Sequence, residues 1–99
     1  ESISKLNYTT LKGSDMIAIE RKRQVEVEGY NARHDNNEQD GTLEKAAMAY
    51  LYSSVGNRKE GMKVWPWCLP FFKPKTQVRD LVRAGALIAA AIDRLCSKE

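Results

Sequence analysis

Apolar residues recur at intervals of three and four positions in three segments of this chain, which is the spacing of one helix face. The clearest segment runs from Gln77 to Leu95, and Thr76 can cap its start. Its apolar positions form an unbroken stripe: Val78, Leu81, Val82, Gly85, Ile88, Ala89, Ile92 and Leu95. A glycine inside a helix costs about 1 kcal/mol relative to alanine. Gly85 therefore indicates a close helix contact, either with Ala46 and Ala47 or with a second copy of the chain.

A second helix is expected from about Met16 to Glu28, because Ser14 and Asp15 can accept hydrogen bonds from free backbone N–H groups. Residues 20–24 are almost all charged and are expected to form a solvated face. Glu20 can pair with Gln24 one turn further on. Residues 24–28 alternate between polar and apolar, which also fits a strand, so the end of this helix stays open.

A third helix is expected to begin at Asp40-Gly41-Thr42 and to end near Val55, with Gly56 as its stop. One face of it shares the helical spacing: Leu43, Ala46, Ala47, Tyr50, Leu51 and Ser54. The small side chains at Ala46 and Ala47 allow a close neighbour.

The remaining segments lack a helical pattern. Residues 1–12 are expected to be an extended or flexible arm, in which Tyr8 to Leu11 can add a short strand. Residues 30–41 form a polar loop, and residues 57–75 form a loop rich in proline and aromatic residues that packs over the helices. The predicted fold is mainly α, with about three helices in a single compact domain over residues 13–99.

Composition agrees with one ordinary globular domain, because 42% of the 99 residues are hydrophobic. The longest apolar run, from Ala84 to Ile92, is only nine residues long. A membrane-spanning helix needs about 20, so no membrane span is expected. The first residues also lack the basic and then apolar pattern of a signal peptide.

The formal net charge of +3 is unevenly distributed. Residues 1–40 carry six basic and eight acidic residues, a net of −2, whereas residues 41–99 carry ten basic and five acidic residues, a net of +5. The second half therefore suits an acidic partner. Duplex DNA is not expected, because the total charge is modest and no basic recognition helix is visible.

Metal and catalytic chemistry find little support in the sequence. His34 is the only histidine, and a transition-metal site normally uses two or more His or Cys ligands. We expect no metal, no cofactor and no catalytic residue. An enzyme acting on nucleotides stays an alternative, with His34, Asp35 and Glu38 as its only candidate centre.

Four aromatic side chains alternate with lysines between residues 63 and 75. They are Trp65, Trp67, Phe71 and Phe72, beside Lys63, Lys73 and Lys75. Flat rings can stack on a base and lysines can meet its phosphate, which suits a nucleotide or a single-stranded nucleic acid. The alternative is that these rings close the core of a small protein.

Several short motifs together resemble a family of small proteins encoded by bacteriophages and prophages, over about residues 16 to 96. The motifs are Glu20-Arg21-Lys22-Arg23-Gln24, Glu28-Gly29-Tyr30, His34-Asp35, Gly41 with Leu43, Ala46-Ala47, Tyr50, Trp65-Pro66-Trp67, Lys73-Pro74, Leu81-Val82, Ala84 to Ile88 and Ile92 to Leu95. The family carries Trp at the position of Tyr30 and Asp at the position of Asn36. A smaller segment, Gly29-Tyr30 with Asp35, is similar to the signature of ryanodine-receptor repeat domains.

The resemblance implies an accessory protein in the host bacterial cytoplasm. The leading hypothesis is a protein that counters host defence by binding a nucleotide signal or a defence protein. For a nucleotide, Tyr30, Trp65 or Trp67 would stack on the base. The other predicted ligand-binding residues are Arg33, Lys73 and Lys75 for phosphate, and His34 and Asp35 for hydroxyl groups or base edges. The competing hypothesis is an interaction module that forms a homodimer through the Gly85 stripe.

Overall fold

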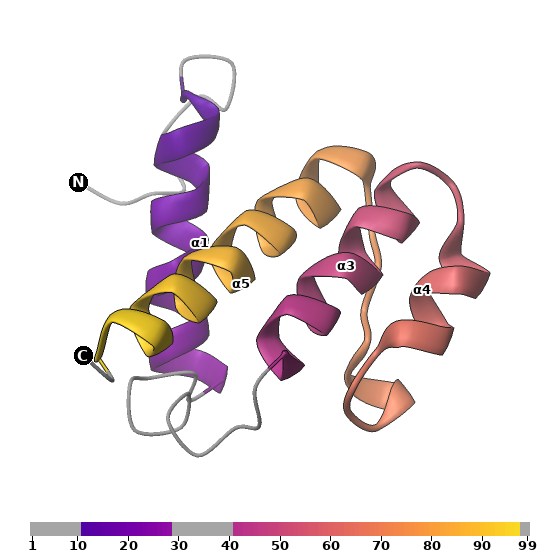
Figure 1. Ribbon diagram of the computed structural model, residues 1–99. Helices are drawn as coiled ribbons and strands as arrows, with labels where there is room; N and C mark the ends of the chain where they lie inside the picture. The colour runs from indigo at the N-terminus through magenta and orange to yellow at the C-terminus, as the bar shows by residue number, and fades with distance from the viewer. Residues whose placement is uncertain (1–10, 29–40, 98–99) are drawn as a thin grey trace.

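The computed structural model describes residues 11–28 and 41–97, and in that part of the chain the protein is helical and contains no strand. Its elements are α1 (Gly13–Glu28), α3 (Thr42–Ser54), α4 (Arg58–Val64), the short 3-10 helix η3 (Leu69–Phe71) and α5 (Gln77–Ser97) (Figure 1). The predicted mainly α fold is confirmed. The suggested N-terminal strand depends on residues 8–10, which lie outside the described part.

The long helix α5 lies at the centre of the molecule, with α1 packed on one side of it and α3 on the other (Figure 1). α4 packs against α3 on the side away from α1. α3 and α5 run antiparallel, and Ser53 near the end of α3 donates to Asp80 in the first turn of α5 at 3.0 Å. The core consists largely of alanine side chains from these two helices, together with Leu43, Tyr50 and Leu87.

Local signals explain most of the helix bounds. Thr76 Oγ accepts from the backbone N–H of Arg79 at 3.1 Å, as expected for the cap of α5. Gly56 has a φ of +84°, a left-handed conformation that suits glycine and ends α3 at its predicted place. α1 continues as a helix to Glu28, which resolves the open alternative for residues 24–28 in favour of helix.

The loop predicted over residues 57–75 is wrong for its first part, where α4 forms. Its prolines lie only at positions 66, 70 and 74, so none of them falls within Arg58–Val64. The side chain of Asn57 accepts from the backbone N–H of Glu60 and caps the helix. The segment after α4 contributes Trp65 and Phe72 to the core.

Candidate functional site

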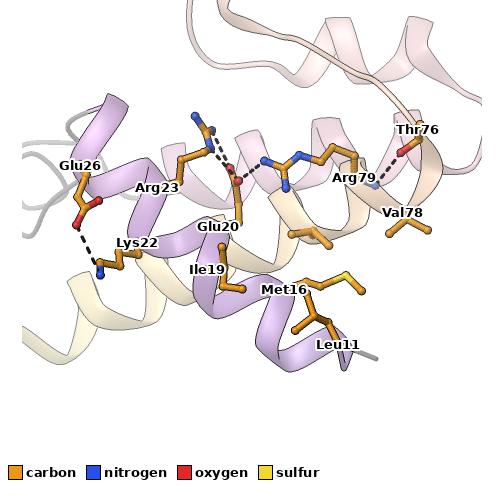
Figure 2. Close-up of a pocket in the computed structure, with 11 residues that line it drawn as sticks. Leu11, Met16, Ile19, Glu20, Lys22, Arg23, Glu26, Thr76, Val78 and Arg79 are labelled. Carbon is orange, nitrogen blue, oxygen red and sulfur yellow. Dashed lines mark hydrogen bonds and ion pairs between the residues drawn. The ribbon is translucent and has the colours of Figure 1, made fainter. Parts of the chain in front are cut away.

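A groove of about 720 Å³ lies between α1 and the start of α5 (Figure 2). We call it the α1–α5 groove. Its apolar lining comes from both helices and from Leu11, two positions before α1: Leu11, Met16, Ile19, Val78 and Val82. Its polar lining consists of Glu20, Lys22, Arg23, Glu26, Thr76 and Arg79. The volume lies within the range of about 300–1,000 Å³ that is typical of small-molecule sites.

The polar side of the groove is organised around a buried carboxylate. Glu20 is only 1% exposed. Arg23 binds it through two nitrogens, at 2.9 and 2.8 Å, and Arg79 donates to it from α5. Gln24 also donates to it at 3.3 Å, as the sequence predicted. The carboxylate therefore joins α1 to the start of α5 while two guanidinium groups balance its charge.

The environment of Glu20 shifts its titration. Burial alone raises the pKa of this carboxyl group, because the charged form loses solvation. The hydrogen bonds and charges of Arg23 and Arg79 outweigh burial and hold the pKa below its ordinary value of 4.5. Glu20 is therefore ionised at neutral pH, and the ion cluster keeps its charges.

Arg79 has hydrogen-bonding capacity beyond its bond to Glu20. One terminal nitrogen of its guanidinium donates to the carboxylate. In Figure 2 another nitrogen points away from Glu20 toward the space bounded by Met16, Ile19 and Val78. The groove thus presents a cationic donor next to an apolar wall.

The prediction that residues 20–24 form a solvated face is wrong for two of them. Glu20 and Gln24 are buried, whereas Lys22, between them in the sequence, is exposed. The partner that makes burial of Glu20 tolerable, Arg79, lies 59 positions away in the chain. No local pattern reveals such a pair, so the sequence alone does not mark Glu20, Arg23 and Arg79 as site residues.

A second surface consists of large aliphatic side chains that stay exposed on α3 and α5. On α5, Leu81, Ile88, Ile92 and Leu95 are between 44% and 54% exposed. At 100° per residue they fall within an arc of about 60°, beside the alanine-rich arc that is buried against α3. On and just after α3, Met48, Leu51 and Val55 are exposed as well. We call these seven side chains the α3–α5 face.

The two sets lie on one side of the helix pair. Each helix has a side that is buried against the other helix. On both helices, a rotation of the same sign about the helix axis leads from this buried side to the exposed aliphatic residues. Because the two helices are antiparallel, both exposed arcs then lie on the same side of the pair. Most residues of the apolar stripe predicted for Gln77 to Leu95 are therefore exposed, because α5 buries its alanine side against α3.

The prediction for Gly85 is also corrected. A Cβ built on Gly85 would lie 2.6 Å from Cδ1 of Ile17 in α1. The close contact that the glycine allows is therefore with α1, not with Ala46 and Ala47, and it lies within one chain. A homodimer has to be argued from the exposed aliphatic residues and not from Gly85.

The aromatic residues predicted to stack on a base mostly pack on one another. Trp65 is 8% exposed and lies between Phe72, stacked at 5.0 Å, and the edges of Tyr50 and Trp67. Its Nε1 donates to the carbonyl of Cys68 at 3.0 Å. Trp67 is partly buried against the core. The structure thus gives Trp65 a core position, in which its ring already has neighbours.

The predicted lysines lie at the surface, near the ring cluster. Lys73 and Lys75 have exposed side chains, and their backbone N–H groups donate to Tyr50 Oη and to Asp80. Neither these lysines' charged groups nor any of the four predicted rings lines the α1–α5 groove. The other predicted ligand-binding residues, Tyr30, Arg33, His34 and Asp35, lie outside the described residues.

No protein-family model, no curated protein and no solved structure matches this chain. In the described ranges, no group of three or more His, Cys, Asp or Glu side chains is arranged to hold a metal ion. None of the helices described there is long and apolar enough to cross a membrane.

Proposed function

We propose that this chain is a phage-encoded accessory protein that acts by binding, and that its working form is a homodimer joined through the α3–α5 face. The observation that carries the proposal is the exposure of seven large aliphatic side chains on one side of two packed helices. For its setting we propose the host bacterial cytoplasm, which the resemblance to phage-encoded proteins implies, and a role in countering host defence.

The size of the face favours a protein partner. Its exposed side chains present on the order of 600 Å² of surface, which is the upper end for the largest apolar patch on a monomer. A standard interface buries about 800 Å² per partner. The face therefore supplies most of the apolar area that a modest dimer needs.

A second copy of the chain is the partner that the face fits best. The seven side chains that define the face are all aliphatic, so they offer a partner apolar contact and not charge. A two-fold dimer brings the same patch from each subunit together, and an apolar patch is complementary to itself. Leu81, Ile88, Ile92 and Leu95 lie seven, four and three positions apart, a spacing suited to packing against a second α5.

A nucleotide ligand receives less support from the described residues. Of the rings predicted to stack, Trp65 is buried and Trp67 is partly buried. Phe71, which is 64% exposed, is the ring that remains open beside Lys73. One open ring beside a lysine is a weaker basis than seven exposed aliphatic side chains on one side of two packed helices.

Light scattering on the full chain across low to high micromolar concentration tests the proposal. We expect a dimer for the native sequence and a monomer for Ile88→Lys. Val27→Lys, which adds the same charge at an exposed position of α1, is the matched control and should leave the dimer intact. A native monomer at the highest concentration would refute the proposal, as would a dimer that survives Ile88→Lys or dissociates equally with Val27→Lys.

A further inference from the structure

The α1–α5 groove combines two kinds of surface that a single ligand could use at once. One wall is aliphatic, from Met16 and Ile19 on α1 and Val78 and Val82 on α5. The other side carries the guanidinium groups of Arg23 and Arg79, each about one-third exposed. Such a groove favours a molecule with an apolar body and a polar head.

The positive charge of Arg79 sets the sign of the head group. Arg79 gives one of its nitrogens to the carboxylate of Glu20, which also binds Arg23. Lys22 lies 3.9 Å from Glu26, and these two charges offset one another. An anionic head beside Arg79 is therefore favoured. A head with one negative charge meets less repulsion from Glu20 than a dianion such as a phosphate monoester does.

The remaining donor has the geometry for a carboxylate. Arg79 uses one terminal nitrogen for Glu20, and another nitrogen is directed toward the aliphatic wall (Figure 2). A carboxylate placed there would accept a charge-assisted hydrogen bond, the stronger kind, in a partly desolvated position. Its apolar body would cover Met16, Ile19 and Val78.

The geometry points to a binding site for an apolar monocarboxylate in the α1–α5 groove, with Arg79 as the residue that recognises the carboxylate. Two sources share this chemistry, a free fatty acid and the C-terminal carboxylate of an apolar peptide. The site is separate from the α3–α5 face, because no residue that lines the groove belongs to that face. The test of this binding site is therefore independent of the test of the homodimer.

Calorimetric titration of the full chain distinguishes the ligand classes. The probes are decanoate below its micellar concentration, decan-1-ol, decylammonium, and a peptide ending in two leucines with either a free or an amidated C-terminus. We expect decanoate or the free peptide to bind at least tenfold more tightly than its uncharged or cationic counterpart. Decanoate binding indicates a free amphiphile, and binding of the free peptide alone indicates a chain terminus. Equal binding of charged and uncharged probes, or no binding, overturns the proposal.

A substitution that preserves folding locates the site. Val78 is 60% exposed and lies in the first turn of α5, where an acidic residue is favourable to the helix. Val78→Asp should therefore keep the melting temperature and weaken binding of the carboxylate at least tenfold, because the new charge competes for Arg79. Gln77→Asp adds the same charge to the same turn but does not line the groove, and it should bind nearly as the native chain does.

Two further readouts complete the test. The methyl NMR signals of Met16 and Ile19 should shift on titration of the native chain, and those of Leu95 on the α3–α5 face should not. Light scattering should give the same oligomeric state for Val78→Asp as for the native chain. Unchanged binding by Val78→Asp, or methyl shifts confined to the α3–α5 face, refutes the assignment of the groove.

Discussion

Glu20 is buried within a highly charged stretch because its charge is balanced from two directions. Arg23, one turn away on α1, supplies two hydrogen bonds, and Arg79 supplies another from α5. A buried carboxylate without partners would cost several kcal/mol. The same pairing that makes its burial tolerable also fixes where α1 meets α5.

Glu20→Gln should destabilise the protein by about 2 kcal/mol at neutral pH, because it leaves two guanidinium groups without their anion. This is less than the loss of about 3–5 kcal/mol expected for a fully buried pair, since Arg23 and Arg79 remain one-third exposed to solvent. Urea unfolding measures the change. Glu26→Gln, which alters an exposed pair at 3.9 Å, should cost less than about 0.5 kcal/mol.

The stability contributed by Glu20 should depend on pH. Its pKa in the folded protein lies below the ordinary value of 4.5, so the folded state holds its proton less tightly than the unfolded chain. The contribution is present above the unfolded pKa and is lost as the pH falls through the folded one. The difference in unfolding free energy between native protein and Glu20→Gln should therefore shrink below pH 4.5. A difference that stays constant into that range contradicts the ion-pair explanation.

Two glycines at helix contacts should respond differently to alanine. A Cβ on Gly61 would lie 2.6 Å from the backbone carbonyl oxygen of Ala49, which is fixed within α3. The Cβ on Gly85 would meet the flexible end of Ile17 instead. Gly61→Ala should therefore destabilise by about 2 kcal/mol. Gly85→Ala should change stability by less than about 1 kcal/mol, since helix propensity offsets the crowding. Equal losses in thermal unfolding would contradict this.

At the level of elements, the sequence predicts helices where capping residues and apolar spacing agree. Thr76 and Gly56 mark bounds that the structure confirms. α4 was missed because a segment of seven residues offers barely two turns of pattern, and the nearby prolines dominated the prediction. Its formation depends on packing against α3 through Gly61, a tertiary contact that no local signal contains.

The helix α5 shows why the strongest pattern did not identify its buried side. Its large aliphatic residues repeat regularly, yet the side packed on α3 is lined by Ala84, Leu87 and Ala91. Small side chains allow two helices to approach closely, so α3 and α5 meet along their alanines. Hydrophobic spacing alone cannot distinguish a face packed inside one chain from a face left for another.

Asp80 connects three parts of the chain and should be costly to remove. This buried carboxylate accepts from Ser53 on α3 at 3.0 Å and from the backbone N–H of Lys75, before α5, at 2.8 Å. Asp80→Ala should cost about 2 kcal/mol, because it leaves two partly buried donors without an acceptor. Ser53→Ala should cost about 1 kcal/mol. In urea unfolding the double variant should lose less than the sum of the two, and strict additivity would contradict this connection.

For the molecule as a whole, the sequence predicted the fold class better than the site. Half of the predicted ligand-binding residues lie outside the described part of the chain. Trp65 packs in the core because Tyr50 and Phe72 surround it. The groove and the α3–α5 face each arise where two helices distant in sequence meet. Their composition follows from helix packing, so it emerges only once α1, α3 and α5 are placed together.

The homodimer also predicts a concentration-dependent stability for the whole molecule. If only folded chains associate, a protein concentration a hundredfold above the dissociation constant adds about 1.6 kcal/mol of stability per chain, because both partners come from the same pool. For a chain of this size, each kcal/mol corresponds to a shift in Tm of about 4–8 °C. Raising the concentration a hundredfold from the dissociation constant in scanning calorimetry should therefore raise the native Tm by roughly 5–10 °C.

Ile88→Lys separates association from intrinsic stability in the same measurement. Ile88 is 44% exposed, so the lysine can keep its charge in water while its stem covers part of the same surface. The dilute variant should melt within a few degrees of the dilute native protein, and its Tm should not change with concentration. A native Tm that is independent of concentration, or an equal slope in the variant, would mean that the α3–α5 face does not join two chains.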